Sequence, residues 1–158
     1  MTSATVHASA VLVGARAVLI RGPSRAGKSR LALALIEAAR AGTLRFARLV
    51  GDDRVHLEPA NGRLLVRPAE PLAGLIEVRT VGIRRLDHEP SAVVGLLVDL
   101  AAADAERLPE TGRLHAVIAG IRLPRLAIAA GAEALPAVLA VLTSGGLEGA
   151  VLGLGLAS

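Results

Sequence analysis

The stretch GPSRAGKS, residues 22–29, fits the phosphate-binding pattern of glycine, four residues, glycine, lysine and serine. Residues 17–20 before it are typical of a buried strand, and residues 31–39 after it are typical of a helix. In that context, backbone N–H groups and the helix N-terminus point at the phosphates of a nucleotide. The residues expected to bind it are Gly22, Pro23, Ser24, Arg25, Ala26, Gly27, Lys28 and Ser29.

Two side chains of this stretch carry separate chemistry. Lys28 is expected to contact the β- and γ-phosphates, and Ser29 offers its hydroxyl to Mg²⁺. The helix is predicted to run from Lys28 to about Arg40 and to end at Gly42, because glycine commonly follows the last helical turn.

The composition limits the classes of function. The chain has 158 residues, enough for one domain with a core, and its hydrophobic residues are almost all aliphatic. With one Phe and neither Trp nor Tyr, stacking on bases is nearly excluded, which argues against binding of single-stranded nucleic acid. The absence of cysteine excludes disulfides and thiolate metal sites and fits a reducing cytoplasm. We see no export-signal pattern and no membrane-helix pattern, so we expect a soluble protein.

Acidic residues follow two predicted strands. Residues 46–50 are apolar and lead to Asp52 and Asp53, a layout typical of metal or base sites in nucleotide-binding α/β proteins. Residues 92–98 are a predicted central strand followed by Asp99. From the pattern alone, both positions remain candidates for the second nucleotide motif.

The other segments predict a single α/β domain, a P-loop-containing mixed β-sheet flanked by helices, over residues 1–145. Residues 3–13 are predicted to form one strand that turns at Gly14 into the strand before the loop, which brings His7 near the loop. Residues 54–58 and 63–67 alternate around a turn and predict a hairpin. The remaining expectations are a loop at 84–90, a strand at 114–121, a helix at 133–142 with Pro136 in its first turn, and a Gly/Leu-rich tail at 146–158.

Four landmarks, taken in order, resemble the catalytic domain of the HPr kinase/phosphorylase family, which phosphorylates a serine of the phosphocarrier protein HPr. They are His7 before the loop, the loop itself, LVGDDRV at 49–55, and LIEVRTVGI at 75–83, which is similar to the family's signature. The likeness covers about residues 3–140. A chain that begins at the catalytic domain resembles the short alphaproteobacterial forms.

The resemblance implies a role for several residues. Ser29 and Glu77 would bind Mg²⁺, which accounts for a carboxylate in an apolar segment. Asp53 would accept the proton of the target serine in the forward reaction and return one in the reverse reaction. The residues with an implied catalytic role are His7, Lys28, Asp53 and Arg107.

The resemblance also extends toward the C-terminus. Residues 121–125, IRLPR, loosely resemble the family segment that is linked to dephosphorylation, but the glycine after the proline is absent. The implied activity is ATP- and Mg²⁺-dependent phosphorylation of HPr, with phosphate-dependent dephosphorylation of phosphoserine-HPr. Inorganic phosphate or pyrophosphate would be a partner in the reverse direction, and the resemblance suggests a hexamer. From the composition, we expect a cytoplasmic protein without a nucleic-acid or membrane partner.

Two alternatives use the same loop. A small-molecule kinase would need a lid or a substrate pocket, and the short chain has no arginine-rich insertion after the loop helix. A non-catalytic, nucleotide-gated binding module would have no need for Ser29, Asp53 and Glu77 together. Both are therefore less favoured than a protein kinase.

Overall fold

The computed structural model describes residues 4–105 and 114–144, which fold as a mixed sheet with two helices packed on it. The main path of the sheet has the strand order β1-β5-β6-β9-β3-β2-β4, and β11 pairs with β9 and β10. The predicted α/β class is therefore confirmed. The strands are β1 (Thr5–His7), β2 (Ser9–Val13), β3 (Arg16–Arg21), β4 (Ala47–Gly51), β5 (Arg54–Ala60), β6 (Arg63–Pro68), β7 (Leu75–Val78), β8 (Gly82–Arg85), β9 (Ala92–Asp99), β10 (His115–Ile118) and β11 (Ile121–Ala127).

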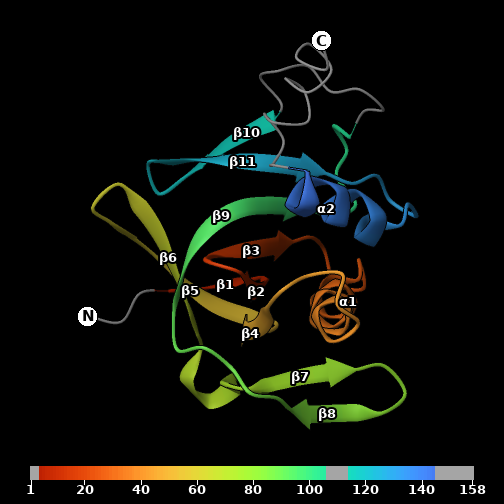
Figure 1. Cartoon of the computed structure of the whole chain (residues 1–158). Helices are drawn as coiled ribbons and strands as arrows, with labels where there is room; N and C mark the ends of the chain where they lie inside the picture. Colours follow the sequence, from red (N-terminus) through yellow and green to blue (C-terminus); the bar gives the residue numbers. More distant parts are fainter. Residues whose placement is uncertain (1–3, 106–113, 145–158) are drawn as a thin grey trace.

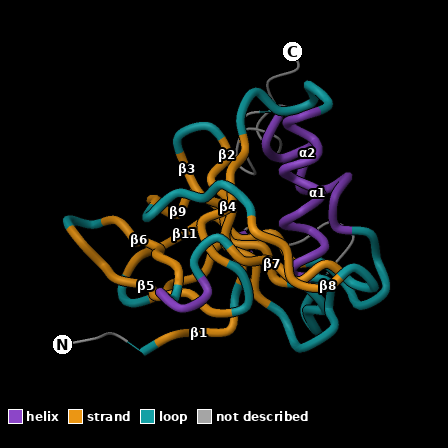
Figure 2. Tube along the Cα trace, turned by 90° about the horizontal axis from the view of Figure 1, so that it is seen from below, coloured by secondary structure: helices purple, strands orange, loops and turns teal. Residues whose placement is uncertain are grey.

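The centre of the sheet is apolar on both faces. Side chains of a strand alternate between faces, and in β3 Val18 and Ile20 join one core cluster while Ala17 and Leu19 join the other. The first cluster lies against α1 (Lys28–Arg40) and α2 (Ala134–Thr143), which cover the same face of the sheet (Figures 1 and 2). Strand β3 pairs in parallel with β9, so both strands end at the same edge, where the phosphate loop begins.

The helix after the loop has the predicted bounds, Lys28–Arg40. Gly27 precedes it with a φ of 102°, a left-handed conformation that glycine adopts without a steric cost. Apolar residues spaced three and four apart, among them Leu31 and Leu35, turn to the core. The second predicted helix is also confirmed as α2, with Pro136 in its first turn.

The hairpin predicted around residues 54–67 is confirmed as β5 and β6. Asn61 and Gly62 connect its strands, with φ values of 52° and 76°. Positive φ at both central residues matches the twist of the flanking strands, and asparagine and glycine tolerate it best.

Three predicted elements need correction. Residues 3–13 are not one strand, because the chain changes partners at Ala8: β1 pairs with β5, and β2 pairs with β3 and β4. The expected strand at 114–121 is instead a hairpin whose second strand, β11, includes Pro124. The expected loop at 84–90 begins as strand β8, which pairs with β7 in a separate small sheet (Figure 1). A short 3₁₀ helix, Glu70–Leu72, lies between β6 and β7.

The described helices are too short or too polar to cross a membrane. The predicted tail at 146–158 and the predicted catalytic Arg107 lie outside the described residues.

Candidate active site

A cleft of about 1010 Å³ opens between the loop after β3, the start of α1 and the β7–β8 hairpin. The structure thus brings together residues that are far apart in the sequence. Of the predicted residues that the structure describes, only Ala26 is missing from its lining. The predicted residues that line it are His7, Gly22, Pro23, Ser24, Arg25, Gly27, Lys28, Ser29, Asp53 and Glu77.

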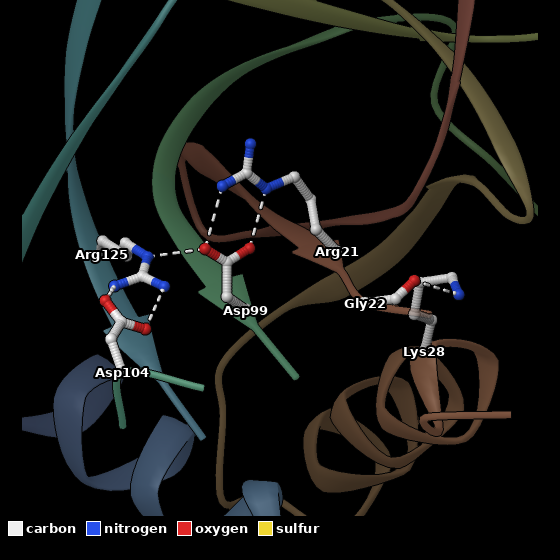
Figure 3. A network of polar contacts seen from close by, with 6 residues as sticks. All are labelled: Arg21, Gly22, Lys28, Asp99, Asp104 and Arg125. Carbon is white, nitrogen blue, oxygen red and sulfur yellow. Dashed lines mark hydrogen bonds and ion pairs between the residues drawn. The ribbon is translucent and has the colours of Figure 1, made fainter. Parts of the chain in front are cut away.

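Lys28 lies folded over the loop. Its Nζ donates a hydrogen bond to the carbonyl oxygen of Gly22 at 2.8 Å (Figure 3) and another to that of Pro23 at 3.0 Å. A lysine ammonium has three donors and no acceptor, so it can only donate to these carbonyls. The two contacts hold the ammonium group beside the backbone that would face a phosphate.

Asp52, for which the sequence predicts no separate role, does not line the cleft itself but contacts Ser29, which does. It is 3% exposed, and its carboxylate accepts hydrogen bonds from Ser9 Oγ at 2.6 Å and from Ser29 Oγ at 2.8 Å. The backbone N–H of Glu77 donates to it at 3.4 Å. These donors compensate the burial of the carboxylate, since a charged group is rarely buried without partners.

Asp53 has the opposite environment. Its side chain is exposed and lines the cleft, and its φ is 69°, a conformation that aspartate tolerates better than most residues. The Ala8 N–H donates to the Asp53 carbonyl at 3.2 Å, which fixes the turn. The preceding Gly51 is required there, because an added Cβ would lie 2.8 Å from Val55 Cγ1. The turn thus directs one aspartate inward and the next outward.

His7 lines the cleft, but it lies on a different strand from the one predicted. It ends β1, opposite Arg54 at the start of β5, and not on the strand next to the loop strand. Arg54 Nη2 lies 3.0 Å from His7 Nε2. His7 and Asp53, the residue before Arg54, both line the cleft.

Glu77 comes from β7, at the base of the small two-stranded sheet. Its side chain is exposed and lines the cleft opposite the loop. Among the described residues, no three His, Asp or Glu side chains form a metal-binding group. Ser29 and Glu77 line the cleft together, and a hydroxyl with one carboxylate is compatible with Mg²⁺, because this ion needs only one or two protein carboxylates and completes its octahedral shell with water and phosphate oxygens.

The alternative acid, Asp99, lies outside this cleft lining. Arg21 donates to it at 2.7 and 2.9 Å and Arg125 at 2.6 Å, while Arg125 also binds Asp104 (Figure 3). Burial raises the pKa of the Asp99 carboxyl, but hydrogen bonds from the two arginines outweigh burial, and the pKa lies below its usual value. The hydrogen bond to Asp104 contributes most to raising the pKa of Arg125. This cluster is a compensated ion-pair network outside the cleft lining, whereas Asp53, after β4, lines the cleft.

The fold and the sequence of the loop together define an α/β domain in which a glycine, lysine and serine loop joins a central strand to its helix. The sequence model of the family described as "HPr Serine kinase C-terminal domain" matches residues 1–129, and the chain belongs to this family.

Individual similar proteins agree with this family assignment in part. The HPr kinase/phosphorylase of Streptococcus thermophilus is 42% identical over 80 residues, which are 50% of this chain and 24% of that protein. A tRNA dimethylallyltransferase of Parvibaculum lavamentivorans is 32% identical over 123 residues, or 78% of this chain and 37% of that protein. The chain therefore spans about a quarter of the kinase/phosphorylase that it matches.

The fold has a solved counterpart. The structure titled as the Hpr(Ser) kinase/phosphatase from Coxiella burnetii superposes with a TM-score of 0.70 and 23% identity, covering 89% of this chain and 88% of that one. This likeness agrees with the family assignment at the level of the fold.

Proposed function

We propose that this chain is a protein serine kinase that transfers the γ-phosphoryl group of ATP to a serine of HPr. One observation carries the proposal: Lys28, Ser29, Asp53 and Glu77 line a single cleft. A phosphate-binding loop alone is compatible with many reactions, whereas an exposed carboxylate facing the loop adds a base for a hydroxyl substrate.

The chain's own residues would act as follows. Lys28 would leave the loop carbonyls and meet the β- and γ-phosphates, and Asp53 would take the proton of the serine hydroxyl as its oxygen attacks the γ-phosphorus. Mg²⁺, when bound with ATP, would neutralise charge on the phosphates. Ser29 and Glu77 would hold it, and Asp52, which accepts from Ser29, would keep that hydroxyl in place.

The same groups support the reverse reaction. An oxygen of inorganic phosphate would attack the phosphorus of phosphoserine, which forms pyrophosphate, and protonated Asp53 would return its proton to the departing serine oxygen. We propose this second activity, a cytoplasmic location and a hexameric state from membership of the family.

The test is to incubate the protein with ATP, Mg²⁺ and purified HPr and to measure the intact mass of HPr. A gain of one phosphoryl group, removed by alkaline treatment as expected for phosphoserine, supports the proposal. Lys28→Ala should abolish the gain, and Arg63→Ala, an exposed cation in the β5–β6 hairpin, is the matched control.

Two other results would point elsewhere. Nucleotide binding without ATP turnover would favour the nucleotide-gated binding module. ATP turnover that small hydroxylated metabolites stimulate, and HPr does not, would favour a small-molecule kinase.

A further inference from the structure

The side chains of His7 and Arg54 form a cross-strand pair at the rim of the cleft. They are directly opposite each other in the antiparallel pairing of β1 and β5. Arg54 Nη2 lies 3.0 Å from His7 Nε2, within hydrogen-bond distance, and Arg54 Nη1 donates to Thr5 Oγ1 at 3.2 Å. Thr5 and His7 lie two residues apart on β1, so one guanidinium spans two side chains on the same face.

The chemistry of the pair fixes the position of a proton. A guanidinium has five N–H donors and no acceptor, so it can only donate to the imidazole. His7 Nε2 must then carry a free lone pair, and the proton of the neutral ring lies on Nδ1. Free histidine in water favours the other tautomer, so the contact changes which ring nitrogen is the donor.

We propose that Arg54 is a positioning residue that holds His7 as the neutral Nδ1–H tautomer. His7 then meets a phosphoryl oxygen as a hydrogen-bond donor through Nδ1, and the positive charge beside it belongs to Arg54. The part that concerns the phosphoryl group rests on the proposed function, whereas the tautomer is a property of the free protein.

The arrangement explains why an arginine directly follows the exposed carboxylate. The Asp53 carbonyl accepts from the Ala8 N–H, and the register pairs His7 with Arg54, so the base, the histidine and the arginine lie where the end of β1 meets the start of β5. A histidine that is held in the wrong tautomer costs a serine protease up to about 10⁴ in rate, which shows how much such a partner contributes.

The first experiment reads the tautomer without any reaction. The protein is labelled with ¹⁵N-histidine, and long-range ¹H–¹⁵N spectra are recorded about two pH units above the ordinary histidine pKa of about 6.5. The chain has four histidines, and His7→Gln assigns the signal of His7. We expect Nδ1–H in the wild type, a shift toward Nε2–H in Arg54→Met, and no change in Arg63→Met, which removes an exposed arginine elsewhere. Nε2–H in the wild type would overturn the proposal.

The second experiment measures phosphoryl transfer to HPr with the same variants. Arg54→Met should lower kcat at least about tenfold with little change in the KM for ATP. Arg54→Lys, which keeps the charge on a shorter donor, should recover part of kcat together with part of the Nδ1–H signal. An Arg54→Met variant that loses the tautomer and keeps kcat would overturn the positioning role. If the wild type does not phosphorylate HPr, the proposed function fails, and the spectrum still decides the tautomer.

Discussion

Two aspartates lie at the ends of sheet strands, both nearly buried, and their partners differ. Asp52, after β4, accepts hydrogen bonds from two hydroxyls and a backbone amide, all neutral donors. Asp99, at the end of β9, accepts from two arginines. A carboxylate bound by neutral donors keeps its negative charge and attracts a cation, whereas one bound by guanidinium groups has its charge compensated. The partners of a buried acid, more than its burial, therefore separate a candidate functional carboxylate from a structural one.

The largest effect should come from the exposed neighbour of Asp52. Asp53→Asn should slow transfer to HPr by a factor of about 10² to 10⁴, the usual worth of a positioned base. ATP affinity should change little, because the loop and the proposed metal ligands remain. Calorimetry with ATP and transfer rates on one preparation test this, and Asp99→Asn, compared per folded molecule, is the control. A variant that loses ATP binding together with transfer would show that Asp53 is not the base.

The next prediction compares Glu77 with Asp99 in their effect on the Mg²⁺ requirement. Glu77→Gln keeps the shape of the side chain and removes its charge, so the Mg²⁺ concentration for half-maximal rate should rise about tenfold or more. Asp99→Asn should leave that concentration unchanged, since arginines already neutralise its site. The measurement is a Mg²⁺ titration of the transfer rate at saturating ATP. The opposite pattern would mean that the wrong acid has been assigned.

The free energy of unfolding should depend on Asp99, although the Mg²⁺ requirement should not. Asp99→Asn removes the charge that Arg125 faces, and both side chains are largely buried. Leaving a buried charge without its partner costs about 3–5 kcal/mol, and because Arg21 is 39% exposed and Arg125 keeps Asp104, we expect about 2–3 kcal/mol here. Urea unfolding of both proteins gives the difference. A loss under about 0.5 kcal/mol would show that the network contributes nothing to stability.

The sequence predicted the elements that depend on neighbouring residues. The loop helix ends at Arg40, two residues before Gly42, and the β5–β6 hairpin turns at Asn61 and Gly62, because these signals are local. The break at Ala8 could not be predicted in this way. Residues 5–7 and 9–13 alternate alike, and only their different partners, β5 for one and β3 with β4 for the other, separate them.

The same limit applies to the site. The pattern of the loop and the two aspartates at 52–53 predicted a nucleotide site, but its assignment of chemistry to Asp53 alone missed the contacts that Asp52 makes. Those contacts join residues 43 and 23 positions apart, a separation that no local pattern records. The choice against Asp99 likewise needed Arg125, which is distant in sequence and adjacent in the sheet.

Acid should weaken the Asp99 network in a defined direction. Because the pKa of Asp99 is lowered in the folded protein, its contribution to stability is present above the unfolded value of about 3.9 and is lost as the pH falls through the folded pKa. The difference in unfolding free energy between the wild type and Asp99→Asn should therefore be constant near neutrality and shrink below pH of about 4. Urea unfolding at several pH values measures it. A difference that grows with acid would contradict the lowered pKa.

The smallest effect concerns the buried side of Asp52. Ser9 is 0% exposed and donates to Asp52 at 2.6 Å, but it does not line the cleft. Ser9→Ala should lower the free energy of unfolding by about 1–2 kcal/mol, because a charged acceptor loses one of its buried donors. The Mg²⁺ requirement should rise less than in Glu77→Gln, since Ser29 and the Glu77 amide still bind the carboxylate.

Urea unfolding and a Mg²⁺ titration on Ser9→Ala and Ser29→Ala separate the roles of the two hydroxyls. Both variants should lose similar stability, and only Ser29→Ala should lose most of the transfer rate. Equal losses of rate would mean that the hydroxyls act only by holding Asp52, and that Ser29 has no separate role at the metal.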